Sequence, residues 1–335
     1  MGKVTIHDVA ERAGVSTSTV SRSFHNHPRI SDETKRRVLR AAQELNYTWQ
    51  EPPDSLVLKS LGVLLPHSSD DLLLHPFFPL VMRGVSLHAQ SRGYVTTYGF
   101  SGEMPDRLRL LEQFVATASV RGIVLLAAYQ EDPCVDYLLG EHVPFVVIGR
   151  PEHAGDVLWV DNDNFHAMYD VVNRLIQAGC RRIAFLGGAE NLNVTHDRLE
   201  GYRMALGNRG IGPDARLVRY AGGFSESDGY RAMVELLAPA RPDGVVATDD
   251  LLALGALKAL SDSGLGPLPC VGFNNCREAR EHVPSLSSVE IRPEELGRHA
   301  ARLVIERMET GTASEDHVIV PTLFVGRETT GHESN

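Results

Sequence analysis

The chain contains 335 residues, of which 43% are hydrophobic and 23% are charged. This length exceeds one small domain and fits roughly two or three, and the composition is ordinary for a globular protein. No apolar stretch approaches the length of a membrane span, which excludes an integral membrane protein. The first residues, MGKVTIHD, lack the apolar run of a secretory signal, so we expect a cytoplasmic location.

The charge is divided unevenly along the chain. Residues 1–47 contain eight Lys and Arg and five Asp and Glu, a net charge of +3. Because the whole chain carries −10, the remainder carries −13. A basic N-terminal segment on an acidic body concentrates attraction for phosphate at one end, which indicates a nucleic-acid partner for that end.

The N-terminal segment has the pattern of three short helices. Apolar residues share one face of a helix over residues 6–13, and Gly14 then provides a turn. Ser16 is placed to cap a helix over residues 17–24, and Ser31 begins a third helix. We expect that helix to direct four residues inward, namely Val38, Leu39, Ala42 and Leu45. This arrangement predicts a helix-turn-helix over residues 1–47, whose second helix enters the major groove of DNA, although three helices and a Gly turn alone also fit a plain three-helix bundle.

The residue types of the second helix suit DNA recognition. Arg22 can donate two hydrogen bonds to a guanine, and short Thr17 and Ser18 allow the helix to approach the base edges. We expect small hydroxyl side chains to contact phosphates and fix the register without reading sequence: Thr5, Ser16, Thr19 and Ser21.

Residues 10–22 contain the motif A-x-x-A-G-V-S-x-x-T-V-S-R, which identifies a DNA-binding head far more specifically than the pattern of three helices does. It resembles the N-terminal signature of the LacI/GalR family of bacterial repressors. The resemblance implies double-stranded operator DNA as a partner and a homodimer, with a tetramer left open, because one helix-turn-helix reads only a half-site.

Residues 48–60 are polar, contain a Pro-Pro step and are expected to form a linker. In the family, a leucine of this linker inserts into the minor groove, and Leu56 matches that position. Pro52 and Pro53 permit a hinge helix only in its first turn, and the connection to the next strand is shorter than is usual in the family. Whether the usual hinge helix forms is therefore left open.

Short apolar strands then alternate with amphipathic helices. The first series of strands covers 61–66, 94–100, 122–128, 144–149 and 157–161, with helices over 80–91 and 106–118. After a helix over 162–178, a second series covers 182–188, 216–222, 244–250 and 270–275. The tail adds a strand over 287–291, a helix over 294–309 and an extended segment over 317–329. Roughly nine strands in two series predict two lobes, each a doubly wound parallel sheet, so the fold class is α plus α/β.

We assign lobe 1 to about 61–160 plus 291–320 and lobe 2 to about 161–290 plus 321–329, with a flexible tail at 330–335. Residues 61–329 resemble the type I periplasmic-binding-protein domain with which the same family senses small molecules. The stretches VDNDN and V-T-x-D-R-L-x-G-Y are similar to its maltose-operon branch. The resemblance implies a repressor whose effector, a small sugar such as maltose or a maltodextrin, binds between the lobes.

A sugar site needs polar side chains for hydroxyls and aromatic faces for the rings. By motif, Phe77, Phe78 and Phe224 match the family's stacking positions, and Arg198, Asp249 and Asn274 match its hydrogen-bonding positions. Further candidates are Tyr129, Asp161, Asn162 and His196.

Several of these candidate residues can instead have a purely structural role. Asp161 and Asn162, or Asp250, can cap helices. Phe77 can be core packing, and Arg198 can form a surface salt bridge.

Two other functions, those of a transport binding protein and of an enzyme, fit the sequence less well. A transport binding protein would need an export signal and no DNA-binding head. An enzyme is not indicated, because no nucleophile elbow, metalloprotease, P-loop or dinucleotide motif is present. Cys134, Cys180, Cys270 and Cys276 form no C-x-x-C pair or His/Cys cluster, so we expect free thiols, and we expect neither a metal nor a cofactor. The sequence departs from the family at one position. Many family members carry an acidic residue directly after the apolar residues PFVVI of the strand predicted over 144–149, whereas this chain has Gly149-Arg150 there.

Overall fold

A computed structural model describes residues 4–24, 30–45, 47, 58–66, 75–101, 104–117, 119–152, 155 and 157–331, with only the backbone of residues 18, 22, 104 and 239. The chain divides into two compact units between Leu58 and Lys59, and each is described by itself. Most of the predicted linker, including Pro52, Pro53 and Leu56, lies outside the described residues.

The first unit consists of α1 (Ile6–Ala13), α2 (Thr17–Phe24) and α3 (Asp32–Glu44), as the sequence predicts. Gly14 ends α1 in the left-handed conformation with φ 65°, and the Ser31 hydroxyl accepts the backbone N–H of Thr34 at the start of α3. The buried core is made by small side chains of all three helices: Val9, Ala10, Ala13, Val20, Val38, Ala41 and Ala42.

One inward residue was predicted wrongly. Leu39 is 45% exposed, and Ala41 faces the core instead. The reason is helical periodicity, because positions 38, 41, 42 and 45 share one face while position 39 points about 100° away from position 38.

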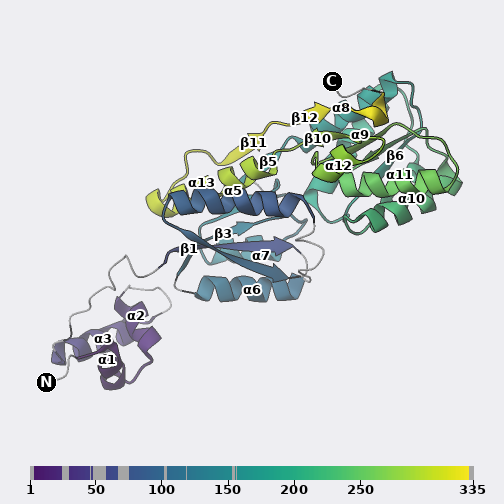
Figure 1. Ribbon diagram of the computed structural model, residues 1–335. Coiled ribbons are helices and arrows are strands. Elements are labelled where there is room, and N and C mark those ends of the chain that lie inside the picture. The colour runs from purple at the N-terminus through teal and green to yellow at the C-terminus, as the bar shows by residue number, and fades with distance from the viewer. Residues whose placement is uncertain are drawn as a thin grey trace. The chain divides into compact units, whose positions relative to one another are not determined.

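The second unit contains two six-stranded sheets (Figure 1). In the first sheet the order is β11 (His317–Val320), β5 (Leu158–Asn162), β4 (Phe145–Ile148), β3 (Val120–Leu125), β1 (Ser60–Pro66) and β2 (Val95–Ser101), and all neighbours are parallel. Helices α5 (Phe77–Ser91) and α13 (Pro293–Thr310) cover one face, and α6 (Met104–Ala116) and α7 (Pro133–Gly140) cover the other.

The second sheet has the order β12 (Leu323–Val325), β10 (Ser287–Glu290), β9 (Cys270–Phe273), β8 (Gly244–Ala247), β6 (Ile183–Gly187) and β7 (Val218–Tyr220). Only β12 runs antiparallel to its neighbour among these described strands. Helices α8 (Asn164–Gln177) and α9 (Asn193–Asn208) pack on one face, and α10 (Glu226–Ala240) and α11 (Asp250–Asp262) on the other. The short elements are α12 (Arg277–Glu281), η1 (Ala215–Leu217) and η2 (Glu328–Thr330).

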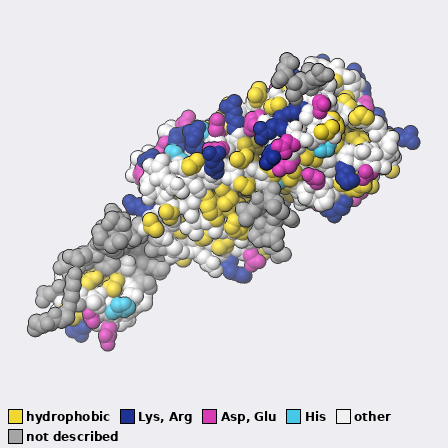
Figure 2. Space-filling model, in the orientation of Figure 1, with side chains coloured by type: hydrophobic (Ala, Val, Ile, Leu, Met, Phe, Trp, Pro, Cys, Tyr) yellow, Lys and Arg dark blue, Asp and Glu magenta, His cyan; other side chains and the backbone are white. Residues whose placement is uncertain are grey.

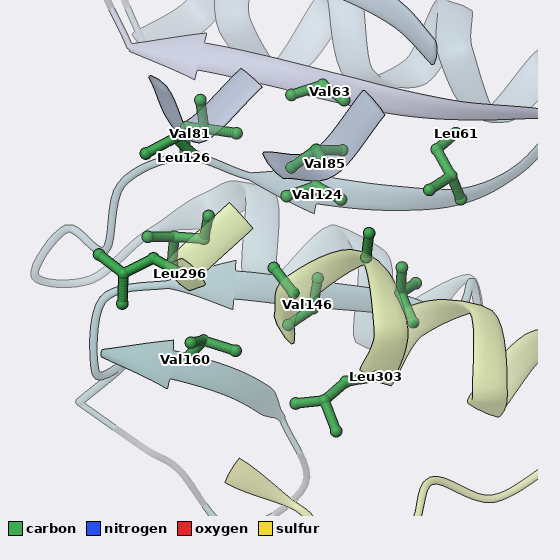
Figure 3. Packing of buried hydrophobic residues seen from close by; sticks show 14 of the residues in the cluster. Leu61, Val63, Val81, Val85, Val124, Leu126, Val146, Val160, Leu296 and Leu303 are labelled. Carbon is green, nitrogen blue, oxygen red and sulfur yellow. The ribbon is translucent and has the colours of Figure 1, made fainter. Parts of the chain in front are cut away.

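Apolar strands fill the space between each sheet and its helices. Figure 3 shows side chains of β1, β3 and β4 directed toward those of α5 and α13. Val63, Val124 and Val146 have no exposed surface, as expected for a parallel sheet covered on both faces. The doubly wound fold with a helix-turn-helix head is thus confirmed.

Several predicted strands were too long. The segment 216–222 is a strand only over Val218–Tyr220, because η1 precedes it, and the segment 244–250 ends as a strand at Ala247. In the second segment Asp249 accepts the backbone N–H of Leu251 at the start of α11 and does not continue the strand. Thr330, assigned to a flexible tail, belongs to η2, and its hydroxyl lies 2.7 Å from that of Ser287.

The chain passes between the two sheets three times: after β5, after β10, and between β11 and β12. One side chain joins these crossings. The Asn162 amide donates to the carbonyl oxygens of Ile291 (3.0 Å) and Val320 (2.8 Å). Because both bonds are buried, they hold the connections between the lobes in a fixed arrangement.

Close packing of α5 on α13 gives a test of this fold. A Cβ atom at Gly84 would lie 2.1 Å from the backbone oxygen of Glu294, so G84A must push the helices apart. We expect the free energy of unfolding to fall by about 1–3 kcal/mol in urea titration. The matched control is G140A, where no atom lies within 4 Å of the added carbon. Equal stability of the two variants would contradict this packing.

Candidate functional site

A cleft opens between the two sheets of the body, where the carboxyl ends of their strands meet. It encloses about 800 Å³, including the part open to solvent. Its walls come from the residues that end or follow the strands, among them Pro66 after β1, Ala127–Tyr129 after β3, Asp161 and Asn162 at β5, Thr248 and Asp249 after β8, and Asn274 after β9. Ligands of doubly wound sheets bind at this edge, and the volume suits a small molecule.

The cleft brings together most of the residues that the sequence singles out. The predicted residues that line it are Phe77, Phe78, Tyr129, Asp161, Asn162, Arg198, Phe224, Asp249 and Asn274. His196 does not line it; its side chain is 53% exposed and lies beside Asp197. His196 and Arg198 are two positions apart on α9, which places them about 200° apart around the helix axis.

Arg198 is buried in the wall of the cleft. Its Nε and Nη2 donate to Asn164 Oδ1 (3.0 and 2.8 Å), and Nη1 donates to the Thr248 carbonyl oxygen (2.6 Å). The guanidinium also lies 4.1 Å from the centroid of the Phe273 ring. The alternative of a surface salt bridge is therefore wrong.

A guanidinium has five N–H groups, so one on each Nη remains for a ligand beyond these bonds among the described residues. Burial lowers the pKa of Arg198 to about 10, which still leaves it charged near neutral pH.

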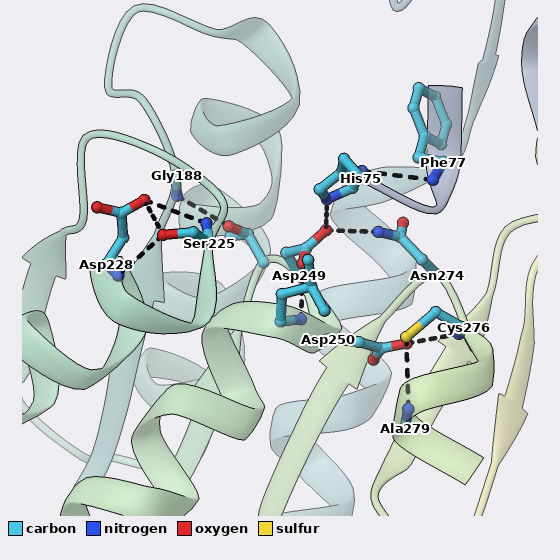
Figure 4. Close-up of polar contacts among 12 residues, drawn as sticks. His75, Phe77, Gly188, Ser225, Asp228, Asp249, Asp250, Asn274, Cys276 and Ala279 are labelled. Carbon is cyan, nitrogen blue, oxygen red and sulfur yellow. Dashed lines mark hydrogen bonds and ion pairs between the residues drawn. The ribbon is translucent and has the colours of Figure 1, made fainter. Parts of the chain in front are cut away.

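Asp249 accepts hydrogen bonds on both oxygens (Figure 4). Oδ1 accepts the backbone N–H of Leu251 (2.7 Å), which caps α11, and Oδ2 accepts from His75 Nε2 (2.8 Å) and Asn274 Nδ2 (2.5 Å). Asp249, not Asp250, is thus the helix cap. The carboxylate also connects the loop after β8 with the turn after β9 and with the start of α5.

Asp250 points away from the cleft into the sheet. It accepts from the Ser288 hydroxyl (2.6 Å) and the Cys276 N–H (2.8 Å), and burial raises its pKa to about 7. As the first residue of α11, it directs its side chain inward, whereas the preceding residue directs its side chain at the exposed N–H groups of the helix. The capping role proposed for Asp250 is wrong.

Asp161 and Asn162 form the framework of the cleft floor. Asp161 accepts the N–H groups of Arg150 (2.9 Å) and Asn162 (2.7 Å) and the amide of Asn164 (2.9 Å). Neither residue caps the next helix, because Asp163 does so by accepting the His166 N–H. Burial raises the pKa of Asp161 to about 6.

Aromatic rings supply the apolar side of the cleft. Phe77 and Phe78 meet edge to face with centroids 5.1 Å apart, and Phe77 also packs against the hydrophobic cores of both lobes. Phe77 is therefore both a core and a lining residue. The Phe224 ring lies directly on Gly188, where a Cβ atom would approach within 2.2 Å of the ring. Tyr129 is stacked under the Arg107 guanidinium, 4.8 Å from its ring centroid.

The absence of an acidic side chain after β4 has a structural reason. Gly149 has φ 108°, a conformation that side chains rarely adopt, and a Cβ atom there would lie 2.9 Å from Ala128 Cβ. Ala128 therefore occupies the place where a side chain at position 149 would begin.

Sequence reasoning missed three polar residues of the cleft: His75, Asn164 and Thr248. His75 lies directly before the Phe77-Phe78 pair, and Thr248 directly before Asp249, so position next to a recognised residue was the available signal. Asn164 offered no signal of its own, because its role is to orient Arg198 from another helix.

In the head, the described hydroxyls already form caps. Thr5 Oγ1 donates to Asp8 Oδ2 (2.8 Å), and Ser16 Oγ accepts the Thr19 N–H (3.2 Å) and lies 2.9 Å from the Thr19 hydroxyl. Val20 and Ser23 form the buried side of α2, while Thr17, Thr19 and Ser21 are half-buried. The side chains of Ser18 and Arg22, and Leu56 altogether, lie outside the described residues.

Comparison with known proteins agrees with both units. The model of the lacI family of bacterial regulatory proteins matches residues 5–50, and that of a periplasmic binding protein-like domain matches residues 172–330. The HTH-type transcriptional regulator MalR of Streptococcus pneumoniae is 36% identical over 307 residues, 90% of this chain and 92% of that protein. The HTH-type transcriptional regulator CelR of Thermobifida fusca is 33% identical over 335 residues, 97% of each chain.

A solved structure of a complex of the transcriptional regulator CelR with cellobiose superposes with a TM-score of 0.76 at 31% identity, covering 98% of this chain and 100% of that one. The head, the two-lobed body and these relatives, which are transcriptional regulators, define a DNA-binding transcriptional regulator. The chain belongs to the lacI family of bacterial regulatory proteins, which confirms the resemblance seen in its sequence.

The Arg198 contacts give a direct test of the site. In R198K a compact ammonium group replaces the planar fork whose three nitrogens donate to Asn164 Oδ1 and the Thr248 carbonyl oxygen in fixed directions. Because this geometry is lost, we expect the free energy of unfolding to fall by about 1–3 kcal/mol. The control is R203K on the exposed face of the same helix, where a change within about 0.5 kcal/mol is expected. Urea unfolding measures both, and an unchanged R198K would mean that these bonds add no stability.

Proposed function

We propose that this regulator is a repressor whose operator affinity is controlled by a small sugar, maltose or a maltodextrin, bound in the cleft. One observation carries the proposal: Arg198, Asp249 and Asn274 line the same cleft as the rings of Phe77, Phe78 and Phe224. Directional polar groups suit hydroxyls, and rings suit the apolar faces of a sugar. The maltose assignment is further supported by the similarity to MalR.

The donors and acceptors divide into two groups. Arg198 has two N–H groups beyond those that bond protein, and Asn274 presents a carbonyl oxygen beside the amide that donates to Asp249. Other polar residues of the cleft make hydrogen bonds with protein groups instead, namely Asp161, Asn162 and Asn164. We therefore assign direct sugar contacts to Arg198 and Asn274, and also to Asp249, where a sugar hydroxyl would replace one of the two donors now on Oδ2. Asp161 and Asn162 are assigned a supporting role.

Tyr129 is assigned a lining role beside the three phenylalanines. His196 receives no role in the cleft, since its side chain lies on the exposed side of α9.

Control of DNA binding follows from a shift of population. The functional lobes are proposed as 61–160 with 291–320 and 161–290 with 321–329. A sugar that binds one arrangement of these lobes better than the other shifts the balance by its difference in affinity. In the proposed mechanism the sugar-bound arrangement disfavours the ordered linker, where Leu56 would enter the minor groove, so operator affinity falls.

At the DNA, α2 is proposed to read bases through Thr17, Ser18 and Arg22, with phosphate contacts from Thr5, Ser16, Thr19 and Ser21. The hydroxyls that now form caps would have to share or turn their hydrogens to reach phosphate. We propose a homodimer on a near-palindromic operator in the cytoplasm, since two-fold symmetry matches two half-sites. Basic and acidic side chains are interspersed over the visible face of the body (Figure 2). Such a mixed surface does not attract phosphate strongly, which fits DNA contact by the head alone.

A second candidate is the same class of regulator with a different effector. The similarity to CelR, whose structure contains cellobiose, favours a β-linked disaccharide as the alternative sugar. A co-repressor that promotes DNA binding is the other variant of this class.

Base reading by α2 is testable with R22A. Loss of a bidentate guanine contact should weaken operator binding by about 1–3 kcal/mol, on the order of 10- to 100-fold, and weaken binding to a random duplex much less. Fluorescence anisotropy at one fixed salt concentration measures both duplexes. An equal loss on both duplexes would make Arg22 a phosphate contact instead.

Effector control is tested by operator anisotropy while maltose and longer maltodextrins are titrated, with cellobiose, glucose, lactose and hypoxanthine alongside. We expect maltose or a maltodextrin to weaken operator binding by about 5- to 150-fold and D249A to abolish the response. A response to cellobiose alone would replace the sugar. Stronger DNA binding with any compound would indicate a co-repressor, and no response to any would refute sugar control.

A further inference from the structure

His75 makes a side-chain contact between the lobes. It precedes α5 of the first lobe, and its Nε2 lies 2.8 Å from Oδ2 of Asp249, which follows β8 of the second lobe (Figure 4). Both side chains are less than a tenth exposed. Within the described residues it is the one ion pair that joins elements of the two sheets, whereas the other ion pairs described in the body lie within a lobe.

Local structure fixes the orientation of the His75 ring. The backbone N–H of Phe77, in the first turn of α5, donates to Nδ1 (3.3 Å). In the neutral ring Nδ1 is therefore an acceptor and the proton is on Nε2, directed at Asp249, whereas in the protonated ring Nε2 still donates to Asp249 and Nδ1 no longer accepts. The ring is also flanked edge-on by Phe78 of its own lobe (5.6 Å between centroids) and Phe224 of the other (5.9 Å).

Oδ2 of the Asp249 carboxylate already accepts two hydrogen bonds in this arrangement. Oδ1 caps α11, and Oδ2 accepts from both His75 and Asn274. A ligand hydroxyl that donates to Oδ2 must therefore replace one of two donors. Asn274 belongs to the same lobe as Asp249, whereas His75 is held by the opposite lobe, so separation of the lobes removes His75 first.

We propose that His75 is a latch that holds the lobes together across the ligand-free cleft by donating to Asp249, and that an effector hydroxyl takes its place. The effector's part rests on the proposed function. The latch itself concerns the ligand-free chain and can be judged without any sugar.

The latch has a defined pH dependence. Burial favours the neutral ring, but the carboxylates of Asp249, Asp250 and Glu278 outweigh it and raise the pKa of His75 above its ordinary 6.5. A histidine with a raised pKa in the folded state contributes stability that is fully present below the unfolded pKa and is lost as pH rises through the folded pKa. The latch is therefore stronger near pH 6 than near pH 8.5, and a competing sugar binds better at the higher pH.

A double-mutant cycle on the full, ligand-free chain tests the latch. The variants are H75N, D249N and the double variant, since Asn at position 75 removes the Nε2 donor, and Asn at position 249 keeps the size of Asp and can still cap α11. The unfolding equilibrium constant is measured in urea at about pH 6 and about pH 8.5. A matched control cycle uses H166N and D163N, whose side chains form an exposed His–Asp pair at 2.7 Å within the second lobe.

We expect a coupling factor on the order of tenfold between positions 75 and 249 at about pH 6, a smaller factor at about pH 8.5, and a factor near one for the exposed pair. Coupling between 75 and 249 that is absent, or no larger than in the control, overturns the latch. If D249N does not fold, ¹⁵N chemical shifts of the histidine rings in the wild-type chain decide the matter. A neutral Nε2–H ring with a raised pKa supports the latch, and an ordinary titration overturns it.

Calorimetric titration of maltose separates this proposal from the proposed function. The wild-type affinity should rise several-fold from about pH 6 to about pH 8.5, and H75N should bind more tightly at the lower pH with little pH dependence. Coupling without maltose binding supports the latch and refutes maltose as the effector. Maltose binding without coupling refutes the latch alone, as does an H75N variant that loses maltose at both pH values.

Discussion

A charged group that is buried away from water destabilises the fold unless hydrogen bonds compensate for its lost hydration. The body of this regulator buries two such groups at its cleft, and their hydrogen bonds organise the residues around them. Arg198 and Asp249 are both nearly inaccessible to solvent. Arg198 is held by a helix of the second lobe and the loop after β8, and Asp249 is held by residues of both lobes. The same bonds that satisfy these charges define where the strands end and how the lobes face each other.

Several contacts connect the lobes, including a backbone bridge between Tyr129 and Leu192 and a hydrogen bond from the Asn193 amide to the Arg150 carbonyl oxygen. Two further contacts differ in whether a ligand can replace them. Asn162 fixes the chain crossings through backbone carbonyl groups, which a ligand cannot replace. His75 connects the lobes through a side chain of the cleft itself, at an oxygen that a ligand can reach. A molecule in the cleft therefore acts on the second contact and leaves the first in place. This difference gives the fold a way to change the arrangement of the lobes without unfolding either sheet.

The sequence predicted both limits of the first two head helices and the start of the third, because these limits are local: Gly14 ends one helix and Ser31 begins another. It also located the cleft, since apolar strands ending in polar residues have few other placements. It failed where tertiary contacts choose between neighbours. Asp249 and Asp250 are equivalent by composition, and only the packing of α11 on the sheet decides which one faces the cleft. His75 gave no periodic signal, because its partner is 174 residues away.

We propose that sugar binding in the cleft lowers the affinity of the head for operator, because the two ligands favour different arrangements of the lobes. Coupling of this kind is reciprocal, so its most direct test is the maltose affinity of the full chain, measured by calorimetry with and without saturating operator duplex. The account predicts that operator weakens maltose binding by the same factor by which maltose weakens operator binding. Equal maltose affinity in the two titrations, or tighter binding with operator present, would contradict it.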